Sequence, residues 1–409
     1  MEASGNSMYM GSGRVTLVHL TTVPQTLGFL RGQIGYMRSR GFEVHAVSSP
    51  GKALDVFGHD EGVATHGIDM PRRITPINDL ASLRSIWGLL HRLRPTIVHA
   101  HTPKGGLLGM IGAWLARVPV RIYHIHGLPL MTAHGLKRQL LTWTERISCW
   151  CAHRVLCVSP SVRQAAIDLR LCPPHKIAVL GSGTINGIDA RTRFSPERLA
   201  ANTRSDRRRA WGVPDDALVI AFAGRIVHDK GVEDLVAAFT SLRERYPNLE
   251  LVLAGEFEPQ DPISPGTEHI LRGDSRIHLL GHVNDMPSVY AAADVLVLPT
   301  YREGFPYVPM EASAMALPVV ATAVPGCVDA VVDGVTGTLV PPRDPGALAE
   351  AIARYLDDPE LRRRHGRAGR ERVLRDFCPE DVWEATYQEY SRLVRQSRRS
   401  IPMPEETAR

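Results

Sequence analysis

Long apolar runs are missing from this 409-residue sequence. No window approaches the roughly 18 apolar residues that a membrane-spanning helix needs. The opening residues Met1–Gly13 are polar and rich in glycine and serine, so they lack the basic and apolar parts of a signal peptide. We therefore expect a disordered tail at residues 1–13 and a cytoplasmic protein.

Cysteine pairs with the spacing of common metal-binding and redox motifs are missing as well. The 6 cysteines include no Cys-x-x-Cys pair, and a hydrophobic content of 44% supplies a core that needs no covalent links. Buried thiols are therefore expected ahead of disulfides or a zinc site.

The chain also lacks a large excess of charge of one sign. The formal net charge is +5 and the sequence pI is about 8.9, without a lysine-rich tail or alternating aromatic and basic residues. This pattern argues against nucleic-acid binding. The mild basicity is compatible with anionic substrates or with an acidic membrane surface.

Short apolar runs that alternate with amphipathic stretches are present throughout, which is typical of βαβ units and parallel sheets. In the first half, strands are expected at Arg14–Leu20, Glu43–Ser49, Thr96–Thr102, Arg121–His126 and Arg154–Ser159, with helices at Asp79–Leu93, Gly106–Ala116 and Leu136–Ala152. In the second half, strands are expected at Leu218–Ala223, Leu249–Ala254, Arg276–Leu280, Asp294–Pro299 and Pro318–Thr322.

Two such series predict an α/β protein with two doubly wound domains, at residues 14–195 and 210–378. A helix is expected at 379–396, followed by a flexible tail at 397–409. The helix is a candidate to pack back across the domain junction, a point that the sequence does not decide. Because parallel sheets bind ligands at the carboxyl ends of their strands, the loops at those ends are the places to look for chemistry.

One such loop carries two cations. A strand ends at Ala223-Gly224, Arg225 follows, and Lys230-Gly231 precedes a helix that begins at Val232. Arginine offers paired hydrogen bonds, lysine a point charge, and a helix start offers unpaired N–H groups, so the loop suits a diphosphate. Taken alone, a solvated basic loop is an equally good interpretation.

A second loop carries two carboxylates, in Glu303-Gly-Phe-Pro-Tyr-Val-Pro-Met-Glu311. Pro309 is expected to open the next helix, which would put Glu311 in the first turn. Acidic residues are common there simply because of the helix dipole. Glu303 has no such explanation, and its neighbours Gly304, Phe305 and Pro306 favour a ligand role. The turns Val324-Pro-Gly326 and Gly281-His-Val283 are weaker candidates.

Together these motifs resemble family 4 of the retaining glycosyltransferases, which have the GT-B fold. The ordered set is Gly224-Arg225, Lys230-Gly231, Glu303-x7-Glu311, Pro325-Gly326 and Asp333-Gly334-x-x-Gly337. The resemblance implies two Rossmann-like domains that face each other across a cleft, the first binding the acceptor and the second a nucleotide-sugar donor. It also implies that Arg225 and Lys230 hold the donor diphosphate and that Glu311 holds the ribose. Glu303 would contact the transferred sugar, and we group Gly304, Phe305 and Pro306 with this donor pocket.

The first half adds a histidine to this set. His126 follows an expected strand, before Gly127, and the resemblance implies that it reaches the donor sugar. We therefore assign His126 and Glu303 as the catalytic residues. His124, two residues earlier, points to the same side of the strand and stays an alternative.

Val98-His-Ala-His-Thr-Pro-Lys104 and Gly181-Ser-Gly-Thr-Ile-Asn186 resemble a bacterial subgroup that builds capsule, O-antigen or glycoprotein glycans on polyprenyl-diphosphate carriers. Lys104, at a helix start, is a candidate for an acceptor phosphate, with an ordinary exposed lysine as the equal alternative. Arg31 is a second acceptor candidate. The family's usual glycine pair after the first strand is reduced to Gly28, so that position receives no role.

Leu136–Ala152 places Lys137, Arg138 and Arg146 beside Trp143 and Trp150, so it could lie on the inner face of an anionic plasma membrane. Packing of its apolar face against the sheet is the alternative.

The expected reaction moves a sugar from a nucleoside diphosphate, with UDP expected from the subgroup, to a glycan hydroxyl with retention of configuration. The sequence has no Asp-x-Asp triplet, the motif that binds metal in the other main glycosyltransferase architecture. No cofactor and no catalytic metal are therefore expected. The alternatives are a nucleotide-sugar epimerase with a similar fold and a glycosyltransferase that uses a soluble small-molecule acceptor.

Overall fold

The computed structural model describes residues 15–73 and 75–399, which group into two compact units. The first unit contains the described residues of 1–124, 143–156 and 383–409, and the second contains 125–142 and 157–382. The tail expected at residues 1–13 lies outside the described residues, as do residues 400–409 of the expected C-terminal tail. Residues 397–399 belong to the last helix.

The first sheet has seven strands in the order β3-β2-β1-β4-β5-β6-β7. The pairs β1–β2, β2–β3, β1–β4 and β4–β5 are parallel. The order of its first six strands is that of a Rossmann sheet, in which the chain reverses its direction of winding between β1 and β4. The strands are β1 Val15–Leu20, β2 Phe42–Ser48, β3 Ala64–Gly67, β4 Ile97–His101, β5 Val120–Ile125, β6 Arg154–Cys157 and β7 Ile177–Val179.

The second sheet has six strands in the order β10-β9-β8-β11-β12-β13, which repeats the Rossmann order with its reversal between β8 and β11. All of its described pairs are parallel, and β9 is buried along its whole length. Continuous apolar strands of this kind are typical of sheets that helices cover on both faces. The strands are β8 Leu218–Ala223, β9 Leu249–Ala254, β10 Ile277–Gly281, β11 Val295–Leu298, β12 Val319–Thr322 and β13 Gly337–Val340.

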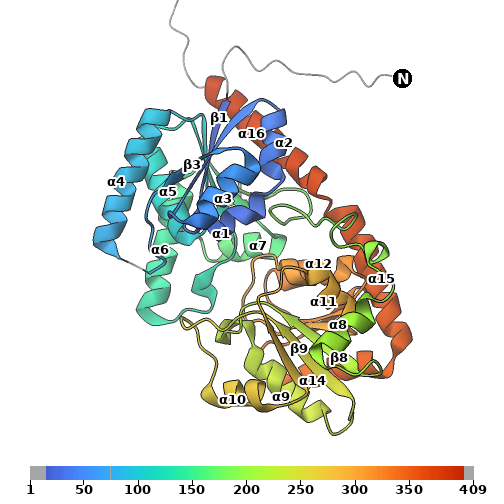
Figure 1. Ribbon diagram of the computed structural model, residues 1–409. Helices are drawn as coiled ribbons and strands as arrows, with labels where there is room; N and C mark the ends of the chain where they lie inside the picture. Colours follow the sequence, from blue (N-terminus) through green and yellow to red (C-terminus); the bar gives the residue numbers. More distant parts are fainter. Residues whose placement is uncertain (1–14, 74, 400–409) are drawn as a thin grey trace, which may run out of the picture. The chain divides into compact units, whose positions relative to one another are not determined.

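Helices connect the strands in both units (Figure 1). Up to residue 211 they are α1 Pro24–Leu27, α2 Gln33–Ser39, α3 Lys52–Glu61, α4 Pro76–Leu93, α5 Pro103–Leu115, α6 Gly135–Cys151, α7 Pro160–Asp168 and α8 Thr203–Trp211. Beyond it they are α9 Val232–Leu242, α10 Pro265–Gly273, α11 Met286–Ala292, α12 Tyr307–Ala314, α13 Cys327–Ala330, α14 Pro345–Asp357, α15 Pro359–Asp376 and α16 Pro379–Arg399. Short 3-10 helices lie at Gly28–Leu30, Pro129–Met131, Pro196–Arg198 and His228–Lys230.

The predicted α/β architecture with two Rossmann-like sheets is confirmed. The predicted strands are all present, whereas β3, β7 and β13 were missed. These three have only three or four residues, and Ala64–Gly67 is largely exposed, so neither length nor apolar pattern marks them. The cysteines form no disulfide, and five of the six are buried, as expected. Among the described helices, none combines the length and the apolar content that a membrane crossing requires.

Candidate active site

The winding reversal of the second sheet gathers the predicted cations and one predicted carboxylate. β8 and β11 are neighbours, and the loops after them carry Arg225 and Glu303. Chain segments leave these strands toward opposite faces of the sheet, which leaves a crevice where ligands bind in open α/β folds. The predicted donor loops therefore lie at the position that this topology favours for a ligand.

Lys230 and Glu303 form an ion pair between Lys230 Nζ and Glu303 Oε1. Their side chains are 19% and 13% exposed, so the pair is largely shielded from water. Lys230 ends the 3-10 helix His228–Lys230, and Gly231 is the N-cap residue of α9. A Cβ at Gly231 would lie 1.9 Å from the Pro299 carbonyl oxygen, so only glycine lets α9 start this close to the end of β11. This close approach brings lysine and glutamate together.

Arg225 follows β8 directly and has a different partner. Its guanidinium forms an ion pair with Glu258, which follows β9. The Arg225 side chain is 59% exposed, so this pair stands in water and contributes little to stability. An anionic ligand can therefore compete for Arg225 at small cost.

The backbone of Gly304 is packed against the His126 segment. A Cβ at Gly304 would lie 1.7 Å from the His126 carbonyl oxygen, a distance that no side chain tolerates. Ser159 donates a hydrogen bond to the Gly304 carbonyl over 2.8 Å and holds the loop from another side. The two predicted catalytic residues thus belong to backbone segments that touch. Burial lowers the pKa of His126 to about 4, so its imidazole is neutral at pH 7.

Phe305 and Pro306 lie inside the protein. Phe305 is 7% exposed, and its ring centroid lies 5.3 Å from that of Phe377. Pro306 is the N-cap residue of α12. Both residues fix the loop that carries Glu303, and their described contacts are with the protein interior.

The prediction that Pro309 opens the helix with Glu311 in its first turn is wrong. The helix α12 begins at Tyr307, so Glu311 is its fifth residue, and the first turn contains no acidic residue. Proline suits any position of the first turn, because none of the N–H groups there has an intrahelical partner. Tyr290 donates a hydrogen bond to Glu311 Oε2 over 2.8 Å, and burial raises the pKa of the carboxyl while Tyr290 and Arg193 lower it. The helix dipole therefore does not explain this residue.

The weaker turn candidates differ in their surroundings. Gly326 donates its backbone N–H to Ser161 Oγ over 2.7 Å, and Ser161 in turn contacts Asp329. The turn at Val324–Gly326 is therefore built into a polar network. His282, in the other turn, is exposed and contacts Asn284 over 3.1 Å.

The acceptor candidates of the first unit contact acidic side chains. Lys104 is the second residue of α5, as expected, and its Nζ lies 2.6 Å from Asp79 Oδ1 and 2.6 Å from the Pro71 carbonyl oxygen. Arg31 lies before α2 and pairs with Asp60 over 3.3 Å at the surface. The structure brings neither residue into contact with the other.

Sequence reasoning missed Tyr290 and Glu258, the partners of Glu311 and Arg225, and Ser159, which holds Gly304. Glu258 could have been found, since it follows a strand of the same sheet edge. Tyr290 lies within α11 and Ser159 precedes α7, and neither position carries a pattern that marks it.

Two family models match the chain. "Glycosyl transferases group 1" matches residues 203–372, and "Glycosyl transferase 4-like domain" matches residues 29–183. Among similar proteins, a capsular polysaccharide biosynthesis glycosyltransferase of Staphylococcus aureus, CapM, is 36% identical over 93% of this chain and 98% of its own length.

Two further similarities are more distant. The UDP-Gal:alpha-D-GlcNAc-diphosphoundecaprenol alpha-1,3-galactosyltransferase of Escherichia coli is 26% identical over 85% of this chain and 89% of its own length. The structure of Anabaena HepE in complex with UDP superimposes with a TM-score of 0.75 at 19% identity, covering 92% of this chain and 100% of that one. At this identity the structural likeness concerns the fold.

Proposed function

Because the chain belongs to the group 1 glycosyltransferases of the GT-B fold, we propose that it transfers a sugar from a UDP-linked donor to a glycan hydroxyl. The acceptor in this proposal is a saccharide on a polyprenyl-diphosphate carrier, used to build capsule or a related surface polysaccharide. The observation that supports it best is the shielded Lys230–Glu303 pair beside the Gly304–His126 contact. The ion pair lies at the winding reversal of the sheet, and the loop that carries Glu303 packs against the backbone of His126.

In the proposed reaction, Lys230 and Arg225 neutralise the diphosphate as it leaves. The bond between the anomeric carbon and the phosphate oxygen breaks, and the acceptor oxygen attacks from the same face. The acceptor proton passes to the departing phosphate oxygen, so the step balances without a protein nucleophile and retains the configuration. Fixed cations that face developing negative charge in a shielded site typically contribute several kcal/mol to such a transition state.

The remaining residues of the site receive binding roles. Glu303 accepts hydrogen bonds from the donor sugar, and Glu311 accepts them from the ribose hydroxyls. His126 is neutral at pH 7, so its ring presents a hydrogen-bond donor and an acceptor to the sugar instead of a charge. No metal is needed in this scheme, because cationic side chains supply the positive charge.

The relatives support the choice of donor and acceptor. The Escherichia coli relative acts on a diphosphoundecaprenol acceptor with UDP-Gal, and CapM acts in capsule biosynthesis. In the first unit, a carrier phosphate would replace Asp60 at Arg31 or Asp79 at Lys104. Replacement is easier at the exposed arginine than at the shielded lysine.

We also propose that α6 rests on an anionic bilayer. The helix buries Glu145, Ser148 and Cys149 and exposes Trp143 and Trp150, which are 62% and 68% accessible. Its apolar face is thus turned away from the sheet, the reverse of an ordinary covering helix. Further exposed apolar side chains on the helix are Leu136, Leu140 and Ile147, and its cations are Lys137, Arg138 and Arg146. Tryptophans beside cations are typical of helices that lie in a membrane interface.

A donor screen tests the function. The purified protein is incubated with a panel of nucleotide sugars and a polyprenyl-diphosphate-linked sugar, and products are identified by mass spectrometry. We expect one UDP-sugar to extend the lipid-linked acceptor by one residue. Epimerised donor in the absence of acceptor, or extension of soluble sugars alone, would contradict the proposal.

A further inference from the structure

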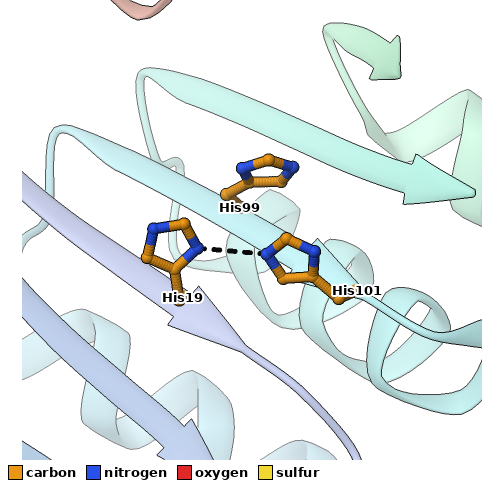
Figure 2. Close-up of side chains that lie close together, drawn as sticks. All are labelled: His19, His99 and His101. Carbon is orange, nitrogen blue, oxygen red and sulfur yellow. Dashed lines mark hydrogen bonds between the residues drawn. The ribbon is translucent and has the colours of Figure 1, made fainter. Parts of the chain in front are cut away.

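Three buried histidines meet at the winding reversal of the first sheet. His19 lies in β1, and His99 and His101 lie two residues apart in β4. The register pairs His19 directly with His99, so all three side chains leave the same face of the sheet (Figure 2). Their exposed fractions are 0%, 2% and 0%. Such a cluster is costly inside a protein unless its nitrogens are engaged.

The nitrogens are close enough to share one ion. One ligand atom from each ring lies within 4.8 Å of the others. His19 Nδ1 and His101 Nε2 are 3.0 Å apart, and the rings of His99 and His101 have centroids 4.2 Å apart. In a tetrahedral zinc site with Zn–N of about 2.0–2.1 Å, ligand nitrogens are separated by roughly 3.3 Å. Small rotations of the rings would give this arrangement.

Hydrogen bonds within the cluster engage only some of its ring nitrogens. His19 Nδ1 and His101 Nε2 engage each other, but His19 Nε2 has no hydrogen-bond partner among the described residues. A buried polar atom of this kind calls for an explanation, and a bound ion is one of the common ones. A ring that turns to present this nitrogen to a cation would satisfy it.

His99 has the support that metal-binding histidines usually show. Its Nδ1 lies 2.6 Å from the Tyr390 hydroxyl, contributed by α16. When a histidine binds metal through Nε2, its ring proton sits on Nδ1 and is donated to a neighbouring oxygen. Tyr390 is fully buried and supplies that oxygen.

We propose that His19, His99 and His101 bind one divalent transition-metal ion, for which Zn²⁺ is the natural probe. The ligand set contains imidazole and neither carboxylate nor thiolate, which favours zinc, copper or nickel over magnesium or calcium. A water molecule would complete the coordination. The ion would tie β1 to β4, and its binding needs neither donor nor acceptor, so this inference goes beyond the proposed function and stands without it.

A second histidine pair provides a matched control. His45 Nδ1 and His66 Nε2, on β2 and β3, lie 3.1 Å apart with stacked rings 5.3 Å apart. The rings of His19 and His101 are also stacked, with centroids 5.3 Å apart. Glu43 Oε1 lies 3.7 Å from His45 Nε2, but no third ligand among the described residues lies within reach of both histidines of the control pair. Zinc binding that needs only a histidine pair can therefore be distinguished from zinc binding that needs the three-histidine cluster.

The experiment uses the full chain without an affinity tag, treated with a chelator, reloaded with Zn²⁺ and dialysed. We expect one zinc per chain in the wild type and in His66→Gln, and less than about a tenth of that in His19→Gln. Zinc at about 100 times its Kd should raise the wild-type Tm by about 3 °C. Wild-type protein without bound zinc, or equal zinc in His19→Gln, would overturn the proposal.

Should His19→Gln fail to fold, X-ray absorption at the zinc edge of the wild-type protein decides the matter. Three imidazole nitrogens at about 2.0–2.1 Å support the site. A shell of sulfur, or of oxygen without imidazole, places the ion elsewhere and refutes it. Neither measurement depends on the donor assay, so the two proposals fail independently.

Discussion

At the residue scale, one lysine supplies positive charge inside the proposed donor site. Lys230 and Glu303 are separated by 73 positions in the chain, yet each is the ion-pair partner of the other in a shielded position. In the proposed reaction the lysine also faces the diphosphate. Its loss would therefore remove a favourable charge from the transition state and leave a carboxylate without its counter-ion.

We expect Lys230→Ala to lower kcat/KM by about 10²–10³-fold, the usual effect of removing one preorganised electrostatic group. The measurement is steady-state transfer with the donor that the screen identifies. Arg245→Ala serves as control, because Arg245 forms an exposed ion pair with Asp357 away from this loop. Turnover of Lys230→Ala at the level of the control would remove Lys230 from the site.

Gly304→Ala tests the packing of the loop that carries Glu303. The added methyl group would overlap the His126 carbonyl, so the loop must move; we expect a stability loss of about 1–3 kcal/mol and at least about 10²-fold lower activity. Gly266→Ala is the matched change, since its Cβ meets nothing within 4 Å. Thermal unfolding and transfer assays on both variants give the comparison. Equal Tm and equal transfer activity of the two variants would show that the close approach of Gly304 to His126 affects neither stability nor activity.

At the level of elements, the apolar pattern predicts where buried strands lie better than it predicts where a helix begins or which face it buries. The apolar runs predicted β8 and β9 to the residue, because a buried parallel strand leaves a continuous apolar signature. The start of α12 was misplaced by two residues, since Pro306 and Pro309 both suit a helix start. The face of α6 could not be predicted, because an amphipathic pattern shows two faces without telling which one meets the sheet.

The orientation of α6 leads to a membrane prediction. Replacing Trp143 and Trp150 together by serine should lower binding to anionic phospholipid vesicles at least about tenfold, because two large apolar side chains no longer enter the interface. Sedimentation with vesicles measures this, and neutral vesicles test the charge requirement. Trp87→Ser, on α4, controls for loss of an exposed tryptophan. Unchanged sedimentation of the double variant, or no binding by the wild type, would end the membrane proposal.

The buried face of α6 gives a pH prediction. Tyr123 donates a hydrogen bond to Glu145 over 2.8 Å, and burial raises the pKa of this carboxyl to about 7. Between the unfolded pKa near 4.5 and the folded value, the native state keeps a proton that the unfolded chain has lost. Stability is therefore complete below about pH 4.5 and falls as pH rises through 7, by about 3 kcal/mol for this group.

Glu145→Gln keeps a hydrogen-bonding side chain and removes the ionisation. We expect its Tm to vary less between pH 5 and 8 than that of the wild type, with the largest gain at the alkaline end. The exposed Glu244→Gln should follow the wild-type curve. If the Tm of all three proteins changed equally between pH 5 and 8, Glu145 would not titrate in this range.

On the scale of the whole molecule, both sheets repeat one strand order, and each has its winding reversal at the end of its first strand. The alternation of strands and helices in the sequence predicts such sheets and places Arg225, Lys230 and Glu303 in loops at the carboxyl ends of strands. Their grouping into one site came from the resemblance of the ordered motifs to family 4 of the glycosyltransferases. The histidine cluster was not predicted, because it depends on the exact register of β1 against β4, which sequence periodicity does not specify.

The proposed donor site predicts how the whole chain responds to its nucleotide. UDP at about 100 times its Kd should stabilise the native state by about 2.7 kcal/mol and raise the Tm by roughly 3 °C. Because Lys230 and Arg225 supply the positive charge, the shift between samples with and without UDP should persist in EDTA. Both samples contain the same chelator, so loss of any structural zinc cancels from the comparison. The shift should shrink in Arg225→Ala and Lys230→Ala but not in Arg245→Ala; a shift that appears only with added Mg²⁺ would contradict a metal-independent diphosphate site.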